Sequence, residues 1–103
     1  MLSKIKTLLG LGQKAGNVIS GSYAVRVALG KKQARLMVIA EDVSDRTRQE
    51  LVELARRNEV PIIVLGTKDE LGQCLGKGQR AAAVVIDQQL ATAIRRAVKE
   101  EES

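Results

Sequence analysis

Apolar residues in this chain form three short continuous runs, separated by stretches in which they recur every three or four positions. The runs are LMVIA at 36–40, IIVL at 62–65 and AAAVVI at 81–86. Short runs of this kind, rich in β-branched residues, predict strands of a sheet that is covered on both faces. The segment NVIS at 17–20 predicts a fourth strand.

The stretches between the runs have the spacing of amphipathic helices. The third of these helices opens at Ser44 or Asp45, and Pro61 follows its end. The fourth opens with a capping box made by Thr67 and Glu70. Five helices are predicted, four over about 2–15, 22–29, 45–58 and 67–75, and a last one carrying Leu90, Ile94, Ala97 and Val98. Helices alternating with strands predict an α/β fold, a three-layer α/β/α sandwich around a four-stranded mixed sheet.

Length and composition predict one domain over residues 1–99, followed by an acidic tail at 100–103. Hydrophobic residues make up 45% of the 103 residues, but Tyr23 is the only aromatic one, so the core is built from aliphatic side chains. The sequence contains no run long enough to span a membrane and does not begin like a signal peptide. With a single cysteine and no histidine, we expect a cytoplasmic protein with no disulfide and no metal site. We also expect a monomer that needs no cofactor.

Charge is distributed unevenly along the chain. The net charge is +5, yet the first acidic residue is Glu41, and residues 1–40 carry seven basic ones: Lys4, Lys6, Lys14, Arg26, Lys31, Lys32 and Arg35. This asymmetry favours a polyanionic partner. The alternative is a solubilising surface in which the basic residues cluster by chance. A membrane surface is not expected, because no basic segment has the apolar aromatic face of an interfacial helix.

Glycines at positions 10, 12 and 16 resemble a nucleotide-binding fingerprint. Such a fingerprint follows a strand and meets an acid about 20 residues later, whereas here a helical pattern precedes the glycines and Glu41 is the first acid. We therefore predict that Gly10 or Gly12 kinks or ends the first helix and that Gly16 caps it. Gly21 precedes the next helix, where Ser20 or Ser22 can serve as the N-cap and free backbone N–H groups can meet an anion.

The sequence contains few residues suited to catalysis. Without histidine the commonest proton shuttle is missing. Cys74 lies at helical spacing from Leu71, which favours a buried position over a nucleophile. Glu41 and Asp42 follow a strand, as catalytic acids often do, but their place before a helix favours a role in the turn. We expect no enzyme and no catalytic residue.

Three segments resemble the L-seven-Ae/L-thirty-e family of kink-turn-binding ribosomal proteins, in particular its short bacterial members. They are LLGLGQKAGNVISG at 8–21, QARLMVIAEDVSDRT at 33–47 and VPIIVLGTKDELGQCLGKGQRAAAVVI at 60–86. The resemblance extends over residues 2–98 and implies the same α/β/α sandwich. It also implies a ribosomal, cytoplasmic protein that clamps a sharply kinked RNA duplex in which sheared G·A pairs expose guanine edges.

The resemblance also implies a binding surface, made by the start of the second helix, the turn after IAED, the start of the fourth helix and the loop before the last strand. Glu41 and Asp42 are expected to support it rather than to contact RNA. With the basic residues near Gly21, the expected RNA-binding residues are Lys14, Gly21, Ser22, Tyr23, Ala24, Arg26, Lys31, Lys32, Lys68, Gly76, Lys77, Gly78, Gln79 and Arg80.

One pair of positions departs from the family pattern. Well-studied members carry an Asn-Glu pair that reads the guanines, and Tyr23 and Ala24 stand in its place. The helix-borne lysine that follows is also replaced, with Arg26 close by or Val27 in register. Shape and phosphate recognition then remain, while Tyr23 either stacks, donates its hydroxyl or is simply exposed.

The sequence therefore predicts a non-enzymatic RNA-binding protein that recognises a kinked duplex, with ribosomal RNA and the ribosome as expected partners. The alternative is a protein–protein adaptor on the same fold with little or no specific RNA binding. The scarcity of aromatic residues argues against binding single strands through stacked bases.

Overall fold

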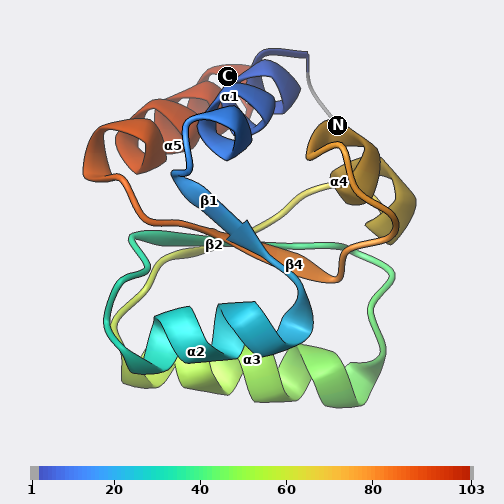
Figure 1. The fold of residues 1–103 in the computed structure, drawn as a ribbon, viewed down its shortest axis with the longest axis vertical. Helices are drawn as coiled ribbons and strands as arrows, with labels where there is room; N and C mark the ends of the chain where they lie inside the picture. The colour runs from blue at the N-terminus through green and yellow to red at the C-terminus, as the bar shows by residue number, and fades with distance from the viewer. Residues whose placement is uncertain (1–2, 103) are drawn as a thin grey trace.

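The computed structural model describes residues 3–102, which form a sheet with helices on both faces (Figure 1). The helices are α1 (Ser3–Lys14), α2 (Ser22–Gly30), α3 (Asp45–Arg57), α4 (Lys68–Cys74) and α5 (Gln88–Glu102). The strands are β1 (Val18–Ser20), β2 (Leu36–Ile39), β3 (Ile62–Val64) and β4 (Ala82–Val85). The predicted α/β fold with five helices and four strands is confirmed.

The sheet is mixed, with the strand order β1-β4-β2-β3. β2 and β3 run parallel, whereas β4 runs antiparallel to both β1 and β2. Val85 of β4 therefore faces Val18 on one side and Leu36 on the other. β4, the last strand in the sequence, lies between β1 and β2. The four-stranded sheet is therefore complete only when β4 is in place.

The central strands are apolar throughout because both faces of the sheet are covered. In β2, Met37 and Ile39 belong to a buried cluster shared with α2 and α3. Leu36 and Val38 point the other way, into a cluster shared with α1, α4 and α5. Figure 1 shows these two helical layers on opposite sides of the sheet.

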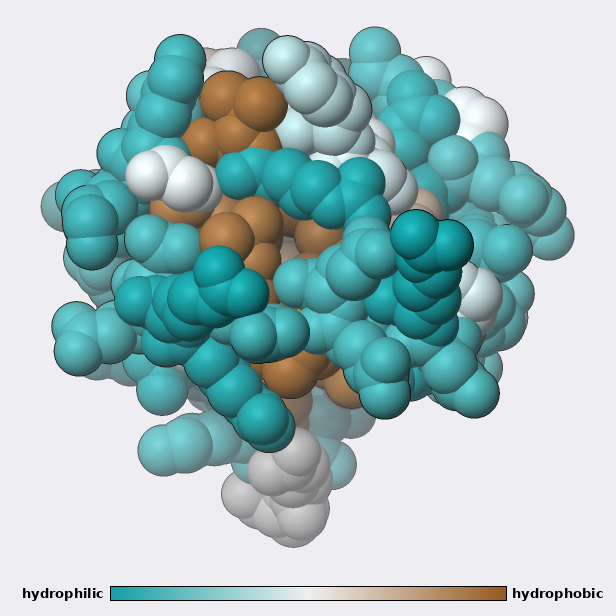
Figure 2. Space-filling view, turned by 90° about the horizontal axis from the view of Figure 1, so that it is seen from below, coloured by the Kyte–Doolittle hydropathy of each residue, from teal (hydrophilic) through white to brown (hydrophobic). Residues whose placement is uncertain are grey.

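The outer face of the α2–α3 layer is largely polar. Figure 2 shows hydrophilic side chains there, surrounding a narrower band of hydrophobic atoms. Arg26 of α2 and Glu50 of α3 form an ion pair at 2.7 Å, and Arg46 holds the other oxygen of Glu50 at 3.2 Å. Together these arginines hold the pKa of Glu50 below its usual range. The two helices are thus linked at their surface as well as through the core.

The glycines of α1 serve packing, and of the two roles predicted for Gly10 or Gly12, a kink or the end of the helix, the second is wrong. Gly10 and Gly12 lie inside α1, which continues to Lys14, so neither residue ends the helix. A Cβ at Gly12 would overlap the Leu90 side chain, which shows that α5 packs directly against this position. Gly16 does cap the helix, as predicted, at a φ of 77°. Its N–H donates to Gln13 and the next N–H donates to the Gly12 carbonyl, which is the Schellman arrangement.

The ends of α3 and α5 also bear on the predictions. Ser44 is the N-cap of α3, because its Oγ accepts a hydrogen bond from the Thr47 N–H at 3.2 Å. The helix ends in a second Schellman arrangement, in which Glu59 takes a φ of 57°. At the other end of the chain α5 continues to Glu102, so residues 100–102 of the predicted tail are helical and Ser103 lies outside the described residues.

Candidate nucleic-acid interface

Four segments far apart in the sequence meet at one end of the sheet, where β1, β2 and β3 end and β4 begins. They are residues 21–23 at the start of α2, 41–42 after β2, 66–68 before and in α4, and 76–80 before β4. We call this surface the glycine edge. The resemblance implied these same segments, and the structure brings them together.

Backbone hydrogen bonds hold the four segments in place. The Gly21 N–H donates to the Ala82 carbonyl at 3.3 Å, which ties the start of α2 to the start of β4. The Glu41 N–H donates to the Gly66 carbonyl at 2.8 Å, which ties the turn after β2 to the turn after β3. The ends of the strands therefore set how these segments lie relative to one another.

Gly21 is the N-cap of α2 and leaves the start of this helix open. Its φ of 99° and ψ of 141° lie in a region that side chains disfavour, and no atom lies within 4 Å of where a Cβ would be. No side chain caps the helix, so the prediction that Ser20 or Ser22 does so is wrong. The first N–H groups of α2 are thus available to an anion, together with the positive end of the helix dipole.

Tyr23 follows in the first turn of α2 and is 80% exposed. Ala24 beside it is half-buried and offers no polar group. The tyrosine is therefore free to lay its ring or its hydroxyl against a ligand at the glycine edge.

Lys68 begins α4, and acidic side chains from two segments accept hydrogen bonds from the backbone around it. The Asp42 carboxylate accepts a hydrogen bond from the Lys68 N–H at 2.8 Å. The predicted capping box is present, since Glu70 N–H donates to the Thr67 hydroxyl and Thr67 N–H donates to Glu70. The latter bond holds the pKa of Glu70 below its usual range. Asp42 is thus committed to supporting the backbone, as the resemblance implied.

The loop at 76–80 lies directly on α4. Gly76 takes a φ of 68° and ends α4 in a third Schellman arrangement. Gly72 inside the helix is buried, and a Cβ there would overlap the carbonyl of Gly78. The sequence interpretation missed Gly72; its only signal was a glycine inside a helical pattern, one turn after Lys68.

Side chains fix the second half of this loop. The side-chain amide of Gln79 donates a hydrogen bond to the Asp69 carboxylate at 2.8 Å. Arg80 is half-buried, its Nε donates to the Ser20 hydroxyl at 3.2 Å, and its N–H donates to the Lys68 carbonyl at 3.1 Å. Arg80 therefore links the loop to β1 and to the start of α4, a role that no sequence pattern predicted.

Three of the remaining predicted site residues, Arg26, Lys31 and Lys32, lie away from this cluster. Arg26 points to Glu50 on α3 rather than to the glycine edge. Lys31 and Lys32 follow the far end of α2, and nine helical residues place them about 13 Å from its start. Lys14 ends α1 and lines a groove of about 410 Å³ that also reaches Gly76. The basic residues of the first 40 positions therefore do not form one patch.

Cys74 lies in this α1–α4 groove, half-buried, and its thiol donates to the Lys6 carbonyl at 3.3 Å. Burial raises the pKa of the thiol, so it stays protonated at neutral pH. Within residues 3–102 no group of histidine, cysteine, aspartate and glutamate side chains is arranged to hold a metal ion. In the same part of the chain no helix is both long and apolar enough to cross a membrane.

Residues 3–95 match the model of the "Ribosomal protein L7Ae/L30e/S12e/Gadd45 family". Among curated relatives, RNA-binding protein YlxQ of Bacillus subtilis is 31% identical over 79% of this chain and 81% of its own length. The large ribosomal subunit protein eL8 of Halobacterium salinarum is 34% identical over 75% of this chain and 67% of its own length.

Solved structures share the fold. A protein of unknown function from Bacillus halodurans superposes with a TM-score of 0.81 at 28% identity, covering 91% of this chain and 99% of its own. The Giardia lamblia 15.5kD RNA binding protein superposes with a TM-score of 0.77, covering 99% of this chain and 91% of its own; at 18% identity it shows the fold alone.

Proposed function

The chain belongs to the ribosomal protein L7Ae/L30e/S12e/Gadd45 family, and from that premise we propose that it is a non-enzymatic, cytoplasmic RNA-binding protein. Its ligand is a kinked RNA duplex of the kink-turn type, carried by ribosomal RNA, and the protein binds it as a monomer in association with the ribosome. The relatives support this proposal, since two of them are named for RNA binding and for the large ribosomal subunit.

The observation that carries the proposal is the convergence of four segments on the glycine edge. The start of α2 offers backbone N–H donors with no side chain in front of them. A phosphate or a base edge can approach such donors closely, and the helix dipole favours negative charge there. Across the same edge, Lys68 and Lys77 add positive charge without an ion-pair partner among residues 3–102.

Recognition then depends on shape and on the phosphate backbone. Ala24 cannot hydrogen-bond to a guanine, and Tyr23 brings one hydroxyl and one ring. The Asp42 and Asp69 carboxylates at this edge keep their charge, but hydrogen bonds from the Lys68 N–H and the Gln79 side chain direct them toward the protein. We propose that Tyr23 packs against the sugar or base beside the kink, while the glycines let the backbone enter the widened groove.

The test is a binding titration with a kink-turn RNA and a straight duplex of equal length. We expect much tighter binding to the kinked RNA and a steep loss of affinity with salt. Equal affinity for both would refute shape recognition.

A charge variant then locates the binding surface. Lys68→Gln should weaken kink-turn binding and lower the slope of log affinity against log salt by about one. The matched control is Lys4→Gln, because Lys4 is exposed on α1 and pairs with Glu100 at 3.2 Å. If the two variants bind equally well, Lys68 does not contact the RNA.

The adaptor hypothesis has one observation in its favour, the less polar surface at Tyr23 and Ala24. Capture of a purified protein partner that survives nuclease treatment and is lost in Tyr23→Ser would support it. Loss of the captured partner after nuclease would instead support RNA.

A further inference from the structure

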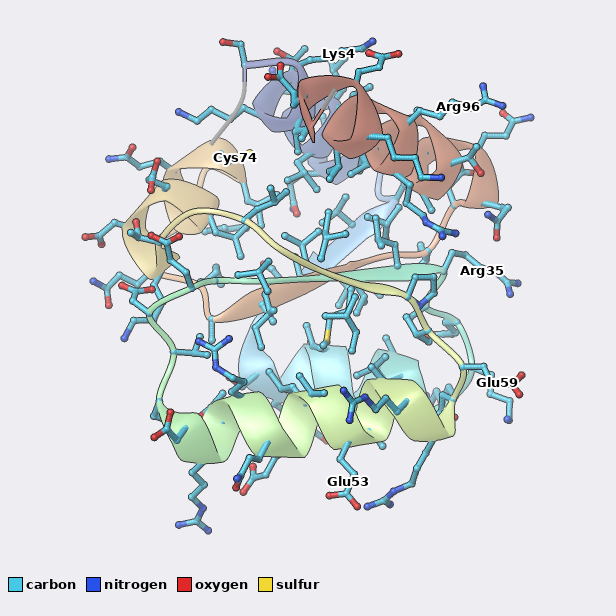
Figure 3. The ribbon with its side chains drawn as sticks, turned by 180° about the vertical axis from the view of Figure 1, so that it is seen from behind. Lys4, Arg35, Glu53, Glu59, Cys74 and Arg96 are labelled. Atoms are coloured by element: carbon cyan, nitrogen blue, oxygen red, sulfur yellow. The ribbon has the colours of Figure 1, made fainter. Side chains whose placement is uncertain are left out.

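A second groove, of about 360 Å³, lies at the end of the sheet opposite the glycine edge. We call it the arginine groove; α2 and α3 end there and α5 begins there. Its polar lining residues are Lys32, Arg35, Asn58, Glu59, Gln88 and Arg95. Figure 3 shows Arg35 and Glu59 together on this side of the molecule, away from Cys74 on α4.

The groove is positively charged. Lys32, Arg35 and Arg95 are all exposed, and within residues 3–102 none of the ion pairs involves them. One acid, Glu59, lines the groove with them. Asp87 lies next to Gln88, but its carboxylate caps α5 by accepting the Leu90 N–H at 2.8 Å. Because this hydrogen bond leaves the carboxylate charged, the local balance is three cations against two acids, Glu59 and Asp87.

Positive charge continues from the groove along α5. Arg95 also lines a neighbouring depression with Thr92, Arg96 and Lys99. Figure 3 shows Arg96 above Arg35 on the same side of the molecule. A ligand that extends beyond one anionic group would thus meet further cations.

The chemistry of the lining matches a nucleic-acid backbone better than a protein. Two guanidinium groups can each bind a phosphate with two parallel hydrogen bonds. The side-chain amides of Asn58 and Gln88 already donate one hydrogen bond each, to the Leu54 carbonyl and the Thr92 hydroxyl, which leaves each of them one N–H for a phosphate or sugar. The groove lining contains no aromatic ring on which a base could stack. The apolar lining is limited to Ala34 and Pro61, which is too little for the apolar anchors of a protein interface.

The arginine groove is separate from the glycine edge. The nine residues of α2 span about 13 Å between the two surfaces, and the whole molecule measures 28 × 28 × 25 Å. We propose that the arginine groove binds the phosphate backbone of a second RNA segment while the glycine edge holds the kinked duplex. This inference rests on the proposed function and adds to it a bridging role between two parts of a folded RNA.

The test uses the whole protein saturated with a minimal kink-turn RNA. A fluorescent straight duplex of about 16 base pairs is then titrated in, and anisotropy is read between about 50 and 200 mM salt. With three phosphate contacts in the groove, the affinity for this duplex should fall about 40-fold across that range.

Paired variants identify the groove. Arg35→Gln with Arg95→Gln should weaken duplex binding at least tenfold and lower the salt slope by about two. Lys4→Gln with Lys6→Gln removes the same charge from exposed positions on α1 and should change binding less than about twofold. Glu59→Gln should strengthen binding, because it removes the acid that lines the groove. Circular dichroism verifies that each variant is folded.

The inference is overturned if the saturated protein does not bind the duplex, or if the two double variants lose equal affinity. Binding of poly-L-glutamate in place of the duplex would also overturn it, because the groove would then suit an acidic polypeptide. Failure of the proposed function is recognised separately, since it appears as equal affinity of wild-type protein for kinked and straight RNA. In that case duplex binding to the wild-type protein and to the same variants is measured without kink-turn RNA.

Discussion

Gly72 is the position at which a single methyl group should disturb the glycine edge most. It is buried inside α4, underneath the loop at 76–80. A Cβ at this position would overlap the Gly78 carbonyl and would stand 3.1 Å from the Lys77 oxygen. Both neighbours are backbone atoms, so no side chain can rotate away, and either the loop or the helix must move.

The expected cost follows from these contacts. Forcing a group into a filled site costs about 3 kcal/mol when the backbone has to shift. Alanine recovers about 1 kcal/mol relative to glycine inside a helix. The net loss of unfolding free energy for Gly72→Ala is therefore about 2 kcal/mol, which lowers Tm by roughly 10 °C in a domain of this size.

Thermal denaturation followed by circular dichroism measures this loss. The matched control is Gly30→Ala, since Gly30 ends α2 and no atom lies within 4 Å of its Cβ position. Kink-turn affinity should also fall in Gly72→Ala, because Gly78 belongs to the loop of the glycine edge. If Gly72→Ala were as stable as wild type, the loop would not be seated on α4 as described.

Two further changes test the local structure. Glu59→Gly should raise the unfolding free energy by about 1 kcal/mol, because Glu59 holds a φ of 57° that glycine adopts freely; Glu59→Gln should not, and a gain in both would refute the strain argument. Glu70→Gln should lower stability at neutral pH, and the deficit should shrink as the pH falls below about 4.5. The pKa of Glu70 is depressed in the folded state, so its contribution exists above the unfolded pKa and is lost as the carboxylate is protonated; a deficit independent of pH in urea denaturation would contradict this.

Local patterns predicted most of the fold. The runs at 36–40 and 81–86 became β2 and β4, because a strand covered on both faces must be apolar at every position. The run at 62–65 became β3, but this is an edge strand with partly buried residues, and its Val64 is 52% exposed. Thr67 and Glu70 form the predicted capping box, because that motif depends only on residues three apart.

What could not be predicted depends on contacts between distant residues. The sequence predicts that Gly10 or Gly12 kinks or ends the helix, because the packing neighbour of Gly12, Leu90, is far away in the sequence. The position of β4 between β1 and β2 is likewise set by packing of the whole chain. Lys31 and Lys32 looked close to Gly21, yet the intervening helix carries them to the opposite end of the molecule.

The candidate site could be predicted only in outline. The resemblance implied its four segments, and the structure shows that they meet. The supporting contacts of Arg80 with Ser20 and of Gly72 with Gly78 were not predictable, since each depends on how a loop lies against another element.

The most direct test of the central claim is amide chemical-shift mapping of the labelled protein during titration with a kink-turn RNA. We predict the largest shifts at Gly21, Tyr23 and Lys68 and in the loop at 76–80, reaching saturation at one RNA per protein. Shifts concentrated on α1 or α3, with the glycine edge unchanged, would contradict this prediction.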